Sequence, residues 1–476
     1  MNAMRKPEAN TSGTLLGNSA YIFLIRFFPT LASVAALVWL SRHMAPTYYG
    51  RYQSFWVQWQ VLQVVACLGL PTVILTYPAA LVNSLVRGIS RLQLCLLITS
   101  LMLVAGGFAV LQWQSSSPFE PWQTGGFLLL SVLGALLEAY ALLGRQFRSL
   151  SLISVAYAGA FMLGHIFLVG QVLTSQQLMS MLLFCNVLRV AALSRLAQQH
   201  FDRVAAVVPS PFKAVRQLWL HTALNDGVQI LFRWIDKFML NFLLPPALFA
   251  LYFNGTLDVP FLPLLLGAAG SGLLLHFGQP NIPDTERVTM LKEVGTVLGS
   301  LVFPLFFFLL YFRYELFGVV FAHRYDAAVP LFLVSGLVIP LRAYNFTAML
   351  QHKSQGRAIT KGAILDLLLA LLLMYPLYRL LGLAGVALAF VISTYCQAAY
   401  YLALTAKLLR VSWVELLPWK MWASQLFRVG IGLLVVHELL ARVVPEVLVV
   451  LIGSGLTCLL GLYLFYNARQ RAQLQP

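Results

Sequence analysis

The segment 219–242 is apolar and long enough to cross a bilayer, yet it carries four charged residues. Asp226, Arg233 and Lys237 are spaced i, i+7 and i+11, so they share one stripe of an α-helix, and Asp236 lies beside it. Charges at membrane depth are costly and normally face a bundle interior or a wet cavity. The spacing therefore predicts a cavity-lining helix. The alternative is that Asp236 pairs with Arg233 or Lys237 within the helix, which makes insertion tolerable.

Two further arginines stand close to prolines in predicted helices. Arg26 precedes Pro29, and Arg342 follows Pro340 with Asn345 on the same stripe. A guanidinium suits phosphate, which favours a cavity position for Arg26. A structural arginine bonded to backbone groups that Pro29 frees is the alternative.

Amide and acidic side chains complete the candidate site. Gln60 and Gln63 share a helix face with Trp56, an arrangement that sugar binding would use, although interhelical hydrogen bonds explain such glutamines as well. Glu138 is a candidate coupling acid or a partner of Arg145, and the sequence leaves both open. Two more acids lie in predicted helices, namely Asp258 and Asp366.

The composition defines the class of protein. Of 476 residues, 60% are hydrophobic and 10% charged, with a mean hydropathy of +0.80, whereas a soluble domain carries about 25% charged residues. The chain is therefore predicted to be an all-α integral membrane protein, and no ten-residue alternation suggests a porin-type barrel. Apolar runs of spanning length occur about fourteen times, at 18–40, 54–77, 92–112, 123–144, 150–170, 176–196, 219–242, 248–274, 294–312, 327–350, 358–378, 383–406, 424–441 and 447–466.

The longest basic linker of the first half suggests a boundary near residue 205. The predicted division is a six-helix lobe at 1–205, a second at 206–410, and two additional helices at 411–476. Tyr52 and Tyr252 end corresponding turns at an offset of 200, which is compatible with a parallel repeat. The last two helices hold Arg428 and Glu438 near the membrane and show no obvious chemistry.

The positive-inside rule orients the chain. With both termini in the cytoplasm, only six Lys and Arg fall in exterior loops: Arg42, Arg51, Arg313, Arg324, Arg379 and Arg442. Much of the +16 formal charge is then topological, and a nucleic-acid partner is not expected. The five cysteines are scattered singly, without the spacing of a metal site.

Motifs for nucleotide binding or zinc hydrolysis are absent from the sequence. The predicted exterior loops are short, whereas a membrane glycosyltransferase or polysaccharide polymerase needs room to assemble donor and acceptor. The sequence therefore favours transport over enzymatic activity. No bound cofactor is expected, apart from a coupling cation that could be H⁺ or Na⁺.

Five segments in order resemble the polysaccharide-transport, or O-antigen flippase, branch of the multidrug/oligosaccharidyl-lipid/polysaccharide (MOP) exporter superfamily. They are SAYIFLIRFFPT, YYGRYQSF, RWIDKFMLNFLLPPALFALYFNGTLDVP, LFGVVFAHRYDAAVPLF and GLAGVALAFVISTYCQAAYYL, within residues 15 to 410. The resemblance implies two six-helix lobes in a V around a central cavity, with alternating access. It also implies a polyprenyl-diphosphate-linked oligosaccharide as substrate, a bacterial inner membrane location among membrane lipids, and a polysaccharide polymerase machinery as partner.

By position, the resemblance assigns Arg26, Arg233, Lys237 and Arg342 to the diphosphate and sugar head group. It assigns the acids as counter-charges or coupling groups, namely Asp226, Asp236, Asp258 and Asp366. Three other functions stay open: a multidrug or cation antiporter of the same superfamily, a flippase for the peptidoglycan precursor, and a membrane glycosyltransferase or polymerase. The buried cations argue for an anionic substrate.

Overall fold

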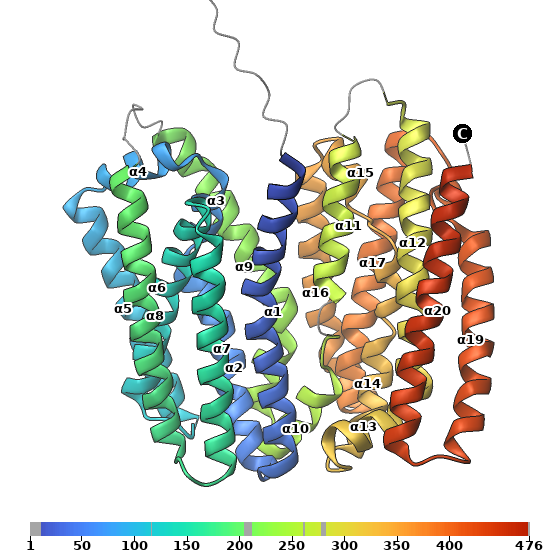
Figure 1. The fold of residues 1–476 in the computed structure, drawn as a ribbon, viewed down its shortest axis with the longest axis horizontal. Helices are drawn as coiled ribbons and strands as arrows, with labels where there is room; N and C mark the ends of the chain where they lie inside the picture. The colour runs from blue at the N-terminus through green and yellow to red at the C-terminus, as the bar shows by residue number, and fades with distance from the viewer. Residues whose placement is uncertain (1–10, 116, 204–211, 260–261, 278–281, 475–476) are drawn as a thin grey trace, which may run out of the picture. The chain divides into compact units, whose positions relative to one another are not determined.

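The computed structural model describes residues 11–115, 117–203, 212–259, 262–277 and 282–474, and all regular secondary structure within them is helical. The helices of each half run roughly parallel to one another (Figure 1). Their bounds are α1 (Thr11–His43), α2 (Pro46–Cys67), α3 (Leu70–Thr76), α4 (Ala79–Arg87), α5 (Arg91–Gln114), α6 (Pro121–Leu143), α7 (Phe147–Val169), α8 (Ser175–Arg203), α9 (Phe212–Leu243), α10 (Pro246–Gly255), α11 (Leu262–Phe277), α12 (Asp284–Tyr311), α13 (Arg313–Phe321), η1 (Asp326–Ala328), α14 (Val329–Gly336), η2 (Ile339–Ala343), α15 (Ala348–His352), α16 (Gly356–Leu381), α17 (Leu383–Leu409), α18 (Trp413–Leu416), α19 (Trp419–Ala441) and α20 (Glu446–Leu474).

Ten of the described helices are long and apolar enough to cross a membrane, or eleven if the bent pair α2 and α3 is one span. The chain is therefore a multi-pass membrane protein. The helix α9 has 32 residues but is not among these spans, in keeping with the charged and amide side chains that it carries. Every one of the fourteen predicted spans coincides with at least one helix.

The chain forms two compact units, Met1–Ala247 and Leu248–Pro476. The helix α9 belongs to the first unit, where it packs on α2 and α3. The boundary predicted near residue 205 lies in 204–211, outside the described residues, so the division into 1–205, 206–410 and 411–476 stays a prediction.

A break between α2 and α3 depends on a glycine. Leu68 and Gly69 both have positive φ, and the two helices meet at an angle of 53°. A Cβ on Gly69 would lie 2.6 Å from the Cα of Ala223 on α9. Only glycine combines this left-handed backbone with so close an approach, so the bend lets α9 contact both helices.

Two predicted continuous helices are interrupted in the structure. The segment 327–350 divides into α14, the 3₁₀ helix η2 and α15, because Pro340 has no backbone N–H to continue the α-helix. The segment 248–274 divides into α10 and α11. Asp258, predicted to be helical, lies instead in the non-helical stretch after α10 and is exposed.

The last two helices are part of the second unit's core. Phe308 of α12 and Phe312, which directly follows that helix, pack with Val429 and Leu433 of α19 and with residues of α20. Side chains of α19 also donate to the backbone of α12: Trp422 Nε1 to the Gly295 carbonyl at 3.0 Å, and Gln425 Nε2 to the Thr296 carbonyl at 3.2 Å. These contacts fix α19 on α12.

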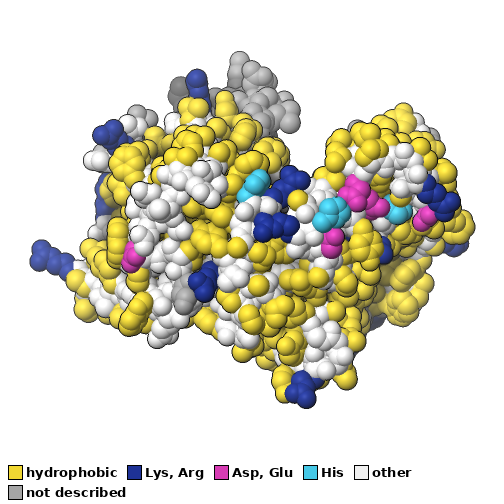
Figure 2. Space-filling view, turned by 90° about the horizontal axis from the view of Figure 1, so that it is seen from below, with side chains coloured by type: hydrophobic (Ala, Val, Ile, Leu, Met, Phe, Trp, Pro, Cys, Tyr) yellow, Lys and Arg dark blue, Asp and Glu magenta, His cyan; other side chains and the backbone are white. Residues whose placement is uncertain are grey.

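Histidines and carboxylates connect α13 and the turn that follows it with α19 and α20 at one end of the second unit. The His323 ring lies between Asp326 and Glu446, with each nitrogen 3.0 Å from a carboxylate oxygen. His437 of α19 is 3.0 Å from Glu315 of α13. Figure 2, which looks onto this end, shows acidic and histidine side chains gathered over one part of the surface.

Candidate functional site

The helix α9 runs antiparallel to α2, and polar side chains join it to α2 at one end and to α3 and the preceding turn at the other. Trp219 Nε1 donates to the Leu68 carbonyl at 2.6 Å, and the Thr72 hydroxyl donates to Asp226 at 2.8 Å. At the other end, Asn241 accepts from the Ser54 hydroxyl at 3.1 Å. The polar face predicted for 219–242 is thus partly a helix contact, and Asp226 is half-buried in it.

Two of the four charges in the 219–242 part of α9 pair with each other. Lys237 Nζ lies 3.4 Å from Asp236, both side chains are 10% exposed, and the ammonium lies 5.6 Å from the Trp234 ring centroid. Arg233 is exposed and forms no ion pair with any described carboxylate. Pairing within the helix therefore occurs for Lys237 and Asp236, whereas the described side chain of Arg233 stays available to a ligand.

A buried amide network joins α2, α5 and α9. Gln58 donates to Asn241 at 2.7 Å and to Ser54 at 3.1 Å, and its carbonyl oxygen accepts from Gln112 of α5. Sequence reasoning selected Gln60 and Gln63 on the same helix, and both are only half-buried. Gln63 donates to the Ser131 carbonyl at 3.4 Å. The sequence did not show which face of α2 packs inward, because glutamines occur on several faces of this helix.

Arg26 lies near the middle of α1 on an exposed stripe with Ser33. Residues Ile25, Ala32 and Ala36 are buried on another stripe, and α7 is the principal neighbour of α1. The Arg26 carbonyl accepts from the Thr30 hydroxyl at 2.8 Å. No described carboxylate forms an ion pair with its guanidinium, which leaves all five donors for a ligand.

Glu138 pairs with a residue other than Arg145, the partner that the sequence suggested. It forms an ion pair with Arg189 of α8 at 2.5 Å, and the two side chains are 26% and 21% exposed. Arg189 also lies over the Tyr157 ring at 5.1 Å. The pairing with Arg145 does not form because Arg145 follows the end of α6, where the chain turns with positive φ.

In the second unit, Asp366 of α16 is fully buried, and neither of its oxygens has a hydrogen-bond partner among the described atoms. The Ser393 hydroxyl of α17 lies beside it but donates to the Phe390 carbonyl at 3.0 Å, and the charge of Arg342 acts on it from a distance. Arg342 is exposed on η2. A buried carboxyl without a donor is stable when it binds a proton or a cation.

Asn345 has a local structural role. Its side-chain oxygen accepts from the backbone N–H groups of Thr347 at 3.2 Å and Ala348 at 3.1 Å, at the start of α15. This bonding occupies the oxygen that a sugar hydroxyl would use. Its predicted place beside Arg342 on one helical stripe is wrong, because η2 ends at Ala343.

The structure therefore groups the predicted residues within each unit. In the first unit, Asp236 and Lys237 form an ion pair, and Asp226 accepts a hydrogen bond from α3. Arg26 and Arg233 are exposed cations of the same unit. In the second unit, Arg342 and Asp366 form no ion pair, and the charge of Arg342 acts on Asp366 only from a distance.

Comparison with known proteins shows the fold. A scan against protein-family models and a search of curated proteins found no match to this sequence. A lipid II flippase, MurJ, in an inward closed conformation is similar over 95% of this chain and 99% of its own, with a TM-score of 0.69 and 13% identity. An inward-facing multidrug resistance MATE family transporter of the MOP superfamily covers 83% of this chain and 98% of its own, with a TM-score of 0.53 and 14% identity. The chain has the fold that these two transport proteins share.

Proposed function

We propose that this protein is a flippase that moves a lipid-diphosphate-linked oligosaccharide from the cytoplasmic to the exterior leaflet by alternating access. The observation that supports it most is the set of three exposed arginines, Arg26, Arg233 and Arg342, which form no ion pair with a described carboxylate. They occur on a fold shared with a lipid II flippase. An inner membrane location and an association with a polysaccharide polymerase machinery accompany this proposal.

The chemistry of the substrate requires such residues. A diphosphate carries negative charge that cannot enter hydrocarbon, so it needs an aqueous path with cations. Arginine binds phosphate through two parallel N–H donors, which orients the head group. Lys237 is the fourth proposed cation, and its pairing with Asp236 means that substrate must compete with that carboxylate.

The acids provide a means of release. Cations that bind a diphosphate too tightly would trap it. Neighbouring carboxylates must therefore be able to replace the diphosphate as the partners of these cations. Glu138 and Asp236 already pair with cations, and Asp226 accepts from Thr72. Asp366 is buried without a donor among the described residues, so it is the acid that we assign to coupling by H⁺ or Na⁺. Asp258 is exposed and stays a proposed counter-charge.

A peptidoglycan-precursor flippase is the second candidate. The similarity to a lipid II flippase over nearly the whole of both chains favours it. Both candidates share the lipid-diphosphate chemistry, and they differ in the saccharide. A multidrug or cation antiporter would need acidic residues facing its ligand, whereas the exposed charges named above are mainly cationic.

Translocation of a lipid-linked oligosaccharide in proteoliposomes tests the proposal. Arg26→Ala, Arg233→Ala and Arg342→Ala are compared with wild type at equal membrane levels. We expect each to reduce the flipping rate by about tenfold or more, since a charge-assisted bidentate contact contributes about 1.5 to 3 kcal/mol. Arg379→Ala removes an exposed cation from the last turn of α16 and is expected to leave the rate unchanged.

Lipid II replaces the oligosaccharide lipid in a parallel series. Faster flipping of lipid II would select the second candidate. If neither lipid moves while a cationic drug is exported, the antiporter is correct and the flippase proposal is wrong.

A further inference from the structure

The end of the second unit that contains the chain's last helical turns has a pocket of about 730 Å³. It lies between the first turns of α12, the loop around α18, the first half of α19 and the last turns of α20. This volume is typical of a small-molecule site. None of the residues assigned to transport lines it.

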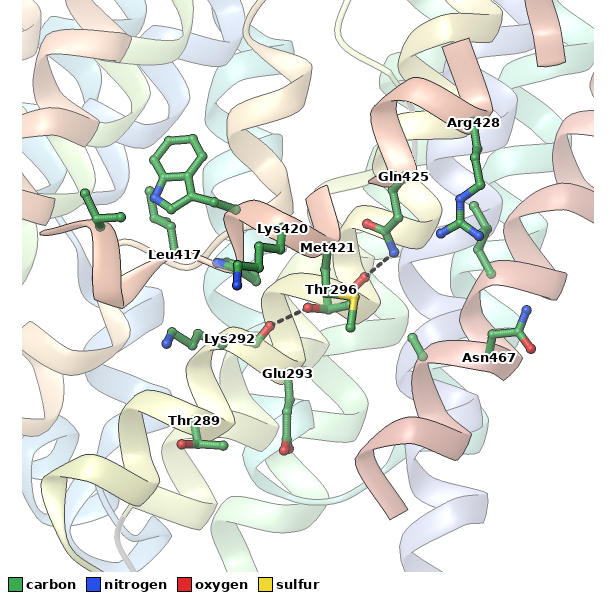
Figure 3. Close-up of a pocket in the computed structure, with 15 residues that line it drawn as sticks. Thr289, Lys292, Glu293, Thr296, Leu417, Lys420, Met421, Gln425, Arg428 and Asn467 are labelled. Atoms are coloured by element: carbon green, nitrogen blue, oxygen red, sulfur yellow. Dashed lines mark hydrogen bonds between the residues drawn. The ribbon is translucent and has the colours of Figure 1, made fainter. Parts of the chain in front are cut away.

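Three cations line this pocket. Lys292 belongs to α12, whereas Lys420 and Arg428 lie two turns apart on α19 (Figure 3). Glu293 is the single acidic residue in the lining. Among the described residues, no carboxylate forms an ion pair with any of the three, although Arg189, Lys237 and Lys353 elsewhere are all paired. The pocket therefore has an uncompensated positive charge.

The pocket walls are held in place by hydrogen bonds. Gln425 and Trp422 attach α19 to the backbone of α12, and the Tyr344 hydroxyl donates to the Leu416 carbonyl at 2.9 Å. Arg428 Nε donates to the Ser424 carbonyl at 3.1 Å, which leaves its terminal nitrogens available. In Figure 3, Arg428 and Asn467 lie at one side of the pocket, and Lys292 and Lys420 at another.

Apolar surface surrounds the charged groups. Val414, Leu417 and Leu464 are part of the lining, and Trp419 is 43% exposed beside Lys420. Next to the lining residues, Phe427 of α19 and Tyr463 of α20 are 70% and 61% exposed. Both helices are long and apolar enough to span a membrane, so we expect this outer surface to face acyl chains. A ligand here meets cations at one end and hydrocarbon at the other.

We propose that this pocket binds the phosphate-bearing head group of an anionic membrane phospholipid. Lys292, Lys420 and Arg428 contact the phosphate, the amides of Gln425 and Asn467 lie beside the glycerol, and the acyl chains follow the apolar faces of α19 and α20. Lysines and arginines near a membrane surface favour anionic lipids in this way. The site is additional to the proposed transport function, because none of the residues assigned to transport lines it.

The full-length protein is purified in detergent with either dioleoylphosphatidylglycerol or dioleoylphosphatidylcholine, and retained lipid is counted by native mass spectrometry. We expect wild type to retain phosphatidylglycerol preferentially. The triple variant Lys292→Gln, Lys420→Gln, Arg428→Gln should lose about tenfold or more of this retention. The matched control Lys407→Gln, Arg410→Gln removes two exposed cations outside the pocket and should keep it.

Equal retention by the triple variant and wild type would overturn the proposal, and so would an equal loss in the control. Inorganic phosphate at millimolar concentration separates a lipid site from a soluble-anion site: displacement of all phosphatidylglycerol by phosphate would overturn the lipid assignment. Should the triple variant fail to fold, Lys420→Gln alone gives the same comparison at smaller amplitude, because this side chain is exposed. Lipid retention requires no flipping, so its failure would leave the proposed function standing.

Discussion

At the scale of single residues, the charged and amide side chains divide into those that hold helices together and those that stay available. Gln58, Asn241 and Asp236 are engaged inside the first unit, whereas Arg26 and Arg233 are exposed. Residue type alone does not separate the two groups. The separation depends on which face of each helix meets a neighbour.

The pair Gln58 and Gln60 tests this distinction on one helix. Gln58→Leu removes bonds to Ser54, Asn241 and Gln112 and leaves buried polar atoms unsatisfied. We expect it to lower the free energy of unfolding by about 2 kcal/mol. Gln60→Leu, at a half-buried position, should change it by less than about 0.5 kcal/mol. Unfolding in detergent measures both, and equal effects would show that the amide network contributes little to stability.

At the scale of elements, breaks in helices are as important as the helices. The bend at Gly69 lets α9 contact both α2 and α3, and Pro340 divides a predicted span into three short pieces. The histidine and carboxylate contacts of α13 and the turn after it with α19 and α20 connect elements that are more than one hundred residues apart in the sequence. A single substitution can remove each of these helix breaks or contacts.

Gly69→Ala tests the bend. The new Cβ would meet the backbone of Ala223, and the positive φ disfavours any residue with a Cβ. We expect a loss of at least about 1 kcal/mol from the backbone conformation alone. Gly106→Ala in α5, where the added methyl meets nothing within 4 Å, is the control and should be neutral or slightly stabilising. Thermal unfolding of the two variants would contradict this account if Gly69→Ala were equally harmless.

His323 makes the contact between the turn after α13 and α20 dependent on pH. The hydrogen bond to Asp326 and the charge of Glu446 raise the pKa of His323 above its usual value of about 6.5. A raised folded-state pKa means that the stabilisation is fully present below about pH 6.5 and is lost as pH rises through the higher value.

Thermal unfolding between pH 6 and pH 9 therefore should show a fall in stability for wild type. His323→Gln removes the titrating group, so its stability should fall less over the same range. Parallel curves for the two proteins would exclude a contribution of His323 to the pH dependence.

At the scale of the whole molecule, helix boundaries recur at a fixed offset along the chain. Helix α1 ends at His43 and α9 at Leu243, and α2 begins at Pro46 and α10 at Pro246, the same offset of 200 that relates Tyr52 to Tyr252. Both tyrosines are buried, at 3% and 0% exposure. This agreement supports the hypothesis of a parallel repeat.

The orientation of the chain is tested with single cysteines in a variant that lacks the five native ones. Val172→Cys lies in the turn between α7 and α8, predicted to be exterior, and Arg410→Cys follows α17, predicted to be cytoplasmic. A membrane-impermeant thiol reagent added to intact cells should label the first and not the second. Reversed labelling would place both termini outside.

The sequence by itself determined the class of the molecule and the place of its helices. Fourteen apolar runs sufficed for this, because crossing hydrocarbon imposes the same length and composition on every span. It also identified α9 as exceptional, since charges at membrane depth are rare enough to be noticed one by one. Hydropathy did not predict that Pro340 and Gly69 would interrupt a helix, because a break also depends on the neighbouring helix that packs against it.

Only the tertiary structure decided which polar residues meet. Glu138 pairs with Arg189 rather than Arg145, Asp258 leaves its helix, and Gln58 rather than Gln60 is buried. The last two helices, which showed no chemistry in the sequence, contribute most of a cationic pocket. The physical reason is that pairing depends on helix rotation and on distances of a few ångströms between segments far apart in the chain, and neither quantity is encoded in the spacing along a single helix.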